Sequence, residues 1–146
     1  MGMRLQSISA AALALALVPA LAQAAPAVGD TLACTSRHKD RQLFVVVGRI
    51  TPYGEKGSVA NVSLVDKAAT ARLPQADHLP VDMQMVQASC PRKSATALPL
   101  GAHFEDGYAE WRQAFDAGAA GVFALSIDQI DDLLQGQEPK ATESKP

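Results

Sequence analysis

The sequence predicts an α+β fold, in which a small antiparallel sheet of three to four strands is packed by an aromatic-striped helix and a short C-terminal helix. Two observations predict this fold class. Runs rich in Val, Thr and Leu with strand character occupy the middle of the chain, whereas apolar residues at helical spacing occupy the last third. Strands that precede helices along the chain favour α+β over an alternating α/β arrangement.

An apolar leader precedes the predicted domain. Arg4 supplies a positive charge, and the run Ile8–Val18 is dominated by Ala and Leu. The tripeptide Ala22-Gln23-Ala24 then offers the small residues that a signal peptidase accepts. Residues 1–24 are therefore predicted to be a secretory signal peptide, cut between Ala24 and Ala25. This pattern predicts a periplasmic or secreted protein of bacterial origin.

The rest of the chain is predicted to form a single globular domain over residues 25–136 and a disordered polar tail over 137–146. The chain carries a net charge of −2. Nucleic-acid binding needs a clustered basic face, so no nucleic-acid partner is expected. The densest basic stretch, Arg37–Arg41, is interpreted as a solvated turn. No further long apolar run and no cysteine at the cleavage site is found, so no membrane anchor is expected after cleavage.

Two cysteines, Cys34 and Cys90, follow the leader. An even number of cysteines in an exported chain predicts a disulfide. This bridge would close a long loop and stabilise the fold by about 4 kcal/mol. The absence of C-x-x-C or H-x-x-x-H spacing disfavours a metal site with His38. His38 and His78 both lie in predicted polar turns and are expected to be solvated.

Three runs of residues have strand character. Asp30–Ser36 predicts a short strand that carries the first cysteine. Gln42–Thr51 contains the continuous apolar run Phe44–Val47, which is typical of a central strand covered on both faces. Ser58–Asp66 is also β-rich, and the loop before it contains Pro and Gly. The second and third runs are therefore predicted to pair as an antiparallel hairpin.

The region after the hairpin is less regular. Lys67–His78 has no clear period and contains a proline, so a surface loop is predicted. Leu79–Cys90 fits either a strand or a helix with Asp82 as N-cap. Its Met, Gln and Ala residues favour the helix. Arg92–Ala102 is predicted to be a second loop.

The last third of the chain predicts two helices. Aromatic residues at spacings of four, three and four define a helical stripe that ends near Gly118. A short buried strand is predicted next, over Val122–Leu125. Ser126 and Gln129 fit a capping box at the start of a helix over Ile127–Gln135, which Gly136 ends. The stripe consists of Phe104, Tyr108, Trp111 and Phe115, and the last helix is expected to bury Ile127, Ile130 and Leu134.

One cluster has the chemistry of a binding site. His103, Glu105 and Asp106 lie at the start of the aromatic helix, and Tyr108 and Trp111 lie on it. A His with two carboxylates can bind a metal or transfer protons. The helix dipole already explains the acidic residues, however. These five residues are therefore candidate binding residues, and no catalytic residue, metal site or cofactor is assigned.

The sequence favours a non-enzymatic exported envelope protein that binds a protein partner or a small ligand, because no catalytic motif is found. One alternative is a small periplasmic metal-dependent or acid–base hydrolase that uses His103 with Glu105 or Asp106. Another alternative is a structural or assembly component that acts through a sheet edge.

Overall fold

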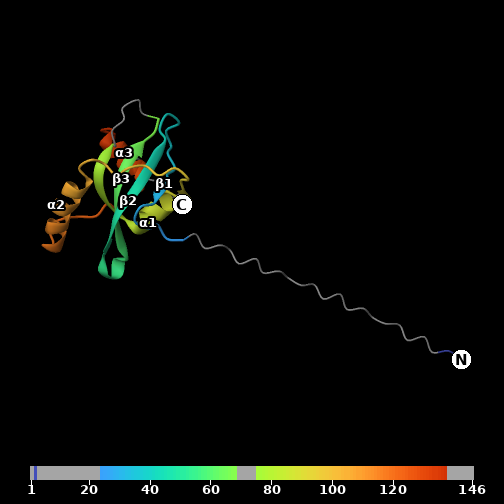
Figure 1. Cartoon of the computed structure of the whole chain (residues 1–146), viewed down its shortest axis with the longest axis horizontal. Coiled ribbons are helices and arrows are strands. Elements are labelled where there is room, and N and C mark those ends of the chain that lie inside the picture. Colours follow the sequence, from blue (N-terminus) through green and yellow to red (C-terminus); the bar gives the residue numbers. More distant parts are fainter. Residues whose placement is uncertain (1, 3–23, 69–74, 138–146) are drawn as a thin grey trace, which may run out of the picture.

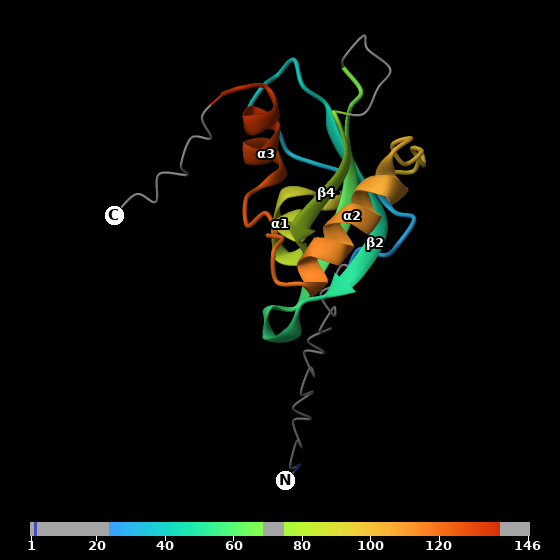
Figure 2. The same ribbon diagram turned by 90° about the vertical axis from the view of Figure 1, so that its left-hand side faces the viewer.

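The computed structural model describes residues 2, 24–68 and 75–137, which form one sheet with helices on both of its faces (Figure 1, Figure 2). The sheet has five strands in the order β4-β3-β2-β1-β5, and all neighbouring strands are antiparallel. The described residues also form three α-helices. The predicted α+β class is therefore confirmed, with five strands in place of the three to four expected.

A long hairpin forms the centre of the sheet. β2 (Leu43–Pro52) and β3 (Ser58–Asp66) pair along their whole length. Their connection contains a short 3-10 helix, η1 (Gly54–Lys56), and Gly57 after it has a φ of 92°. Glycine adopts this backbone conformation without the steric cost that a side chain would bring. The predicted hairpin is confirmed, and β2 is the middle strand of the sheet.

Two of the three outer strands, β4 and β5, include residues that are predicted to be loop. β1 (Thr31–Ala33) lies inside the predicted first strand, and β5 (Arg92–Lys93) pairs with it at one edge. β4 (Ala76–Asp82) forms the other edge. The loop prediction is therefore wrong at the start of Arg92–Ala102 and at the end of Lys67–His78. Both segments are strands because their backbones pair with a neighbouring strand. Their side-chain patterns do not reveal this pairing.

The ambiguous segment Leu79–Cys90 contains both a strand and a helix. Its first four residues complete β4, where Val81 is fully buried. α1 (Met83–Ser89) follows, and Asp82 Oδ1 accepts a hydrogen bond of 2.8 Å from the backbone N–H of Gln84. The favoured helix, with Asp82 as its N-cap and Cys90 at its end, is confirmed, and the residues before Asp82 belong to the edge strand.

One face of the sheet carries the main hydrophobic core. Alternate residues of β2 and β3 pack there against α1 and α3 (Ile127–Leu134). The predicted disulfide is confirmed: Cys34, just after β1, is bonded to Cys90 at the end of α1. The bridge therefore holds α1 against this face. The buried residues of this hydrophobic core include Leu43, Val45, Val47, Ala60, Val62, Leu64, Val86, Ile127 and Ile130.

α2 (Phe104–Asp116) covers the opposite face of the sheet (Figure 2). Phe104 is 1% exposed and lies against Gly48 of β2. A Cβ atom at Gly48 would lie 2.2 Å from the Phe104 ring, which is far inside van der Waals contact. Glycine at this position therefore lets the first ring of α2 reach the sheet backbone.

The connection from β5 to α2 crosses this second face. The backbone N–H of Leu98 donates to Thr31 Oγ1 over 3.0 Å, and that of Gly101 donates to Ser63 Oγ over 2.9 Å. Thr31 lies on β1 and Ser63 on β3, so the connection is bonded to two separate strands. A Cβ at Gly101 would lie 2.7 Å from the Cα of Asp77, which explains the glycine. The chain then enters α2 close to β4.

The C-terminal elements agree with the sequence in part. Val122–Leu125 is not a strand, and only Phe123 forms an isolated bridge to β4. α3 begins with the predicted capping box, in which the side chains of Ser126 and Gln129 bond each other's backbone N–H groups. The expected burial of Leu134 is wrong, because this side chain is 43% exposed. The inward side of α3 is partly occupied by aspartates, as described below.

Gly118 and Gly136 end α2 and α3 as expected, each with a φ of 73°. In the part of the chain that the structure describes, no helix is long and apolar enough to cross a bilayer. Most of the predicted signal peptide, the predicted tail after residue 137 and residues 69–74 of the predicted loop lie outside the described residues.

Candidate functional site

The predicted binding cluster at the start of α2 faces solvent. The side chains of His103 and Asp106 are 78% and 91% exposed, and His103 Nδ1 lies 3.9 Å from Asp106 Oδ2. Glu105 forms an ion pair of 3.1 Å with Arg49 of β2. The cluster is therefore a set of charged side chains exposed at the start of α2.

Tyr108 and Trp111, the two aromatic residues of the predicted site, have different roles. Trp111 is 9% exposed, and its Nε1–H donates to the backbone oxygen of Gly121 over 2.9 Å. Trp111 therefore joins α2 to the backbone that follows it. Tyr108 is only half-buried, and the Arg49 guanidinium carbon lies 5.4 Å from its ring centroid. Tyr108 therefore remains available at the surface.

Two more half-buried rings continue from Tyr108 towards the β2–β3 hairpin. The ring centroids of Phe115 in α2 and Tyr53 after β2 lie 5.6 Å apart. Lys56 Nζ lies 5.2 Å from the Tyr53 centroid. The Arg112 guanidinium carbon lies 5.9 Å from the Phe115 centroid. We define the aromatic–cation face by its three rings and three cations, which belong to Arg49, Tyr53, Lys56, Tyr108, Arg112 and Phe115.

His78 of β4 lies beneath α2, so the expectation of a solvated turn is wrong. Its Nε2 lies 2.8 Å from Asn61 Oδ1, and the Asn61 amide N–H donates to Thr51 Oγ1 over 3.1 Å. The Asn61 oxygen is therefore an acceptor, which places the His78 proton on Nε2. Burial lowers the pKa of His78 below 6.5. Its ring also contacts the rings of Phe104, Tyr108 and Trp111.

We expect this buried histidine to make the protein less stable in mild acid. The pKa of His78 is lower in the folded chain than in the unfolded chain, so the unfolded chain takes up the proton first. The stabilisation is present above pH 6.5 and is lost as the pH falls from 6.5 towards the folded pKa. Urea unfolding of the His78→Gln variant between pH 7.5 and 5 should show a weaker pH dependence than the wild-type protein.

The matched control is His103→Gln, because the His103 side chain is exposed. This variant should keep the wild-type pH dependence. An unchanged pH dependence in His78→Gln would contradict the role assigned to burial of the ring.

A polar network that sequence reasoning missed joins α3 to the turn after β1. Arg37 donates to both Asp128 and Asp132, and His38 Nε2 lies 2.9 Å from Asp132 Oδ1. Hydrogen bonding to Asp128 raises the pKa of Arg37. Both carboxylates are buried. The prediction of a solvated turn holds for Arg37, Lys39 and Asp40, which are exposed. It is wrong for Arg41, which is largely buried, and His38 is half-buried and bound to Asp132.

Arg41 extends the network further inward. Its Nη1 lies 2.8 Å from Asp66 Oδ2, and its Nε donates to Asp131 Oδ2 over 2.9 Å. The side chains of Asp66 and Asp131 are 2% and 1% exposed, and that of Arg41 is 14% exposed. Hydrogen bonding to Asp131 raises the pKa of Arg41. Among the described residues, every buried side-chain nitrogen and oxygen atom has a hydrogen-bond partner.

Three groups of this network have the spacing of metal ligands. One ligand atom each from His38, Asp128 and Asp132 lies within 4.8 Å of the others. The guanidinium of Arg37 binds both carboxylates and supplies the compensating positive charge. The network is therefore an internal ion-pair cluster that holds the turn on α3. The sequence signal that could have revealed it is the spacing of three and four residues between Asp128 and the two later aspartates.

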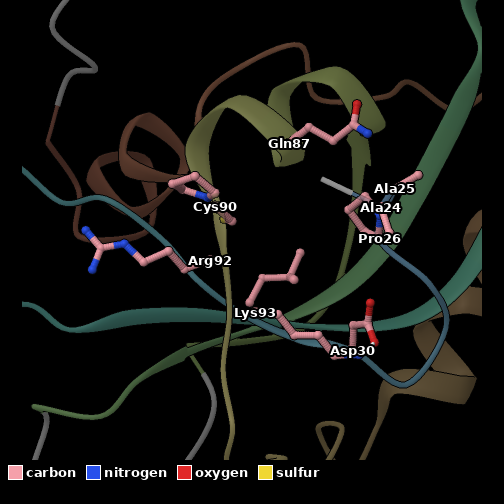
Figure 3. Close-up of a pocket in the computed structure, with 10 residues that line it drawn as sticks. Ala24, Ala25, Pro26, Asp30, Gln87, Cys90, Arg92 and Lys93 are labelled. Carbon is pink, nitrogen blue, oxygen red and sulfur yellow. Dashed lines mark ion pairs between the residues drawn. The ribbon is translucent and has the colours of Figure 1, made fainter. Parts of the chain in front are cut away.

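A groove of about 570 Å³ lies between the residues before β1, the end of α1 and strand β5 (Figure 3). Its position is distinct from the aromatic–cation face. Ala24, Ala25 and Pro26 lie at one end, and Arg92 lies at the opposite end below Cys90. The lining combines apolar and charged groups, among them Pro26, Asp30, Leu32, Cys90, Arg92 and Lys93.

Comparison with known proteins gave no match to a protein-family model, a curated protein or a solved structure. The chemistry of the side chains at each surface is therefore the ground for a functional proposal. The aromatic–cation face is the surface on which that proposal is based.

Proposed function

We propose that this protein is exported and acts as a non-enzymatic binding protein of the bacterial envelope, with the aromatic–cation face as the surface that receives a protein partner. The leader pattern supports export. The Cys34–Cys90 disulfide fits an oxidising compartment outside the cytoplasm. Cleavage between Ala24 and Ala25 would release a periplasmic or secreted chain.

The observation that carries the binding proposal is the pairing of three cations with three half-buried rings on one side of the molecule. Tyr and Arg are enriched among the residues that dominate the energy of protein interfaces. A ring held in place by its neighbours loses little conformational entropy when a partner binds. Tyr53 and Phe115 support each other in this way, and Phe104 and Trp111 support Tyr108.

The charges around this face favour a protein partner over nucleic acid. Arg49 is paired with Glu105, and Arg112 with Asp116, at distances of 3.1 and 3.2 Å. Carboxylates beside the cations would repel a phosphate backbone. A rim that mixes both charges around apolar rings is typical of protein–protein interfaces. Neighbouring groups on a partner would replace these exposed ion pairs at little cost.

Photo-cross-linking in cells that express the full chain tests the proposal. A photoreactive p-benzoylphenylalanine at position 109, an exposed residue of α2 three residues before Arg112, lies beside the aromatic–cation face and leaves its six residues unchanged. The control position is 133, because Leu133 is also exposed and belongs to α3, which lies on the other side of the sheet (Figure 2). We expect one reproducible protein adduct from position 109 and none from position 133. A cross-link to a second copy of the chain would instead support the assembly alternative.

Binding of the purified partner then measures the contribution of the face. Arg112→Glu should weaken binding about tenfold or more, since loss of a hot-spot residue typically costs at least 2 kcal/mol. The urea unfolding curve should change little, because the Arg112 side chain is 40% exposed. Equal affinity of the wild-type protein and Arg112→Glu for the partner, or no adduct at position 109, would contradict the proposed surface. The intact mass of the protein from the periplasmic fraction tests cleavage before Ala25.

A further inference from the structure

We infer that His38 of the turn after β1, together with Asp128 and Asp132 of α3, binds a divalent transition-metal ion, with Zn²⁺ as the ion that fits their donor atoms best. This site shares no residue with the aromatic–cation face, so it does not depend on the protein partner proposed above. It also differs from the cysteine–histidine site that the sequence disfavours, because Cys34 is bonded to Cys90.

The donor atoms already lie close enough to share one ion. One ligand atom from each of the three side chains lies within 4.8 Å of the other two. His38 Nε2 and Asp132 Oδ1 are 2.9 Å apart. Asp128 and Asp132 are four residues apart and therefore lie on the same side of α3. Donors bound to one Zn²⁺ at about 2.0–2.2 Å lie roughly 3–4 Å apart, so small side-chain movements would complete the site.

The Arg37 guanidinium occupies one oxygen of each carboxylate and leaves the other for an ion. It donates to Oδ2 of Asp128 and to Oδ2 of Asp132. In the part of the chain that the structure describes, Asp132 Oδ1 faces His38. Asp128 Oδ1 accepts from the Ser36 hydroxyl and the Arg37 backbone N–H, both over a long 3.3 Å. A hydrogen-bond donor on the second oxygen of a metal-binding carboxylate orients that ligand, and Arg37 is placed to do so.

The charges of the network favour a cation. Each guanidinium serves two carboxylates, so negative charges outnumber positive charges by two before His38 is counted. Charged groups are costly to bury unless they are paired. A divalent ion would supply two further positive charges at the carboxylates of α3. The carboxylates of the network belong to Asp66, Asp128, Asp131 and Asp132, and the guanidinium groups belong to Arg37 and Arg41.

The elements that carry the ligands are bonded to each other through Ser89, the last residue of α1. Its backbone oxygen accepts from the N–H of Thr35 over 2.9 Å, and its Oγ accepts from the N–H of Ile127 over 3.1 Å. The turn and the start of α3 are therefore held together before an ion arrives, which lowers the entropic cost of binding. The His38 side chain is 39% exposed, so an ion can reach it from solvent.

The donor set selects among the divalent ions. Ca²⁺ and Mg²⁺ prefer oxygen ligands alone, whereas an imidazole nitrogen combined with carboxylates suits Zn²⁺. Three protein ligands leave the fourth position of a tetrahedral Zn²⁺ ion for water. An ion with such an open position can be taken up and released, so we expect the protein to bind zinc reversibly.

Calorimetric titration with ZnCl₂ tests the site in protein from the periplasmic fraction after dialysis against a chelator. CaCl₂ is the control of equal charge. We expect one Zn²⁺ ion per chain and much weaker binding of Ca²⁺. In NMR spectra of the imidazole nitrogens, Zn²⁺ should shift the signals of His38 and leave those of His78 and His103 unchanged.

Two variants decide whether His38 is a ligand. His38→Gln should weaken Zn²⁺ binding about tenfold or more, because even the loss of a group that only supports a ligand costs about 10–100-fold. His103→Gln should keep the wild-type affinity and is the matched control, because His103 also lies near a carboxylate, that of Asp106, but both side chains are exposed. Equal affinity of His38→Gln and the wild-type protein, equal affinity for Ca²⁺ and Zn²⁺, or no binding at millimolar Zn²⁺ would overturn the inference.

Discussion

Replacing Arg41 with methionine should lower the free energy of unfolding by about 3–5 kcal/mol, because this is the usual cost of removing one partner from a buried ion pair. Arg41 is the cation that compensates both Asp66 and Asp131, whose side chains are almost completely buried. Without it, Asp131 would keep a negative charge in a site that excludes water. Urea unfolding at neutral pH measures the loss directly.

A second variant separates the charge effect from lost packing. Adding Asp131→Asn to Arg41→Met removes the uncompensated charge, so part of the lost stability should return. Asp66 still accepts hydrogen bonds from the backbone N–H groups of Gln42 and Ala68, at 2.8 and 3.0 Å.

Arg37→Met is the matched control for position 41. Arg37, like Arg41, binds two aspartates, and both of its partners lie on α3. Its side chain is 43% exposed, whereas that of Arg41 is 14% exposed. Water can enter and solvate the carboxylates that Arg37 leaves behind. We therefore expect a clearly smaller loss than for Arg41→Met. Equal losses at the two positions would contradict the argument from burial.

Removal of the disulfide should have a comparable effect. The bridge joins residues that are 56 positions apart. Closing a loop of this length lowers the conformational entropy of the unfolded chain, which raises the free energy of unfolding by about 4 kcal/mol. The double variant Cys34→Ala/Cys90→Ala should therefore unfold at a much lower urea concentration than the oxidised protein. The wild-type protein in the presence of a reducing agent should unfold at nearly the same urea concentration as the variant.

The double variant itself is the control for side effects of the reductant, because its unfolding curve should not respond to reduction. A difference of less than about 1 kcal/mol between the oxidised protein and the variant would contradict the expected role of the bridge. Such a result would mean that the unfolded chain is already compact, or that the folded state opposes the bridge.

Local sequence patterns predicted the elements whose structure depends on residues close together in the sequence. The run Phe44–Val47 has the character of a buried strand, and the capping box of Ser126 and Gln129 is a local hydrogen-bond pattern. The spacing of the aromatic residues likewise predicted α2. In each case the residues that make the signal are close in sequence, so no knowledge of the rest of the fold is needed.

The sequence predicted only some members of the aromatic–cation face, because the exposure of a side chain depends on neighbours that are distant in sequence. The spacing that placed Tyr108 and Trp111 on one stripe did not show that Trp111 is buried while Tyr108 remains at the surface. The face also includes Arg49 and Tyr53, which come from the hairpin and carry no local signal. A helical stripe predicts which residues share a side, but the sheet beneath it decides which of them are covered.

The sequence by itself determined the α+β class, the central hairpin, the two main helices and the pairing of Cys34 with Cys90. Only the tertiary structure decided that the basic turn at Arg37–Arg41 lies on the aspartates of α3 and that His78 is covered by α2. Charged and polar residues read as solvated in a sequence, because burial without a partner costs several kcal/mol. Their partners here lie between 17 and 95 positions away along the chain. Folding alone brings these groups together and removes the cost of burying them.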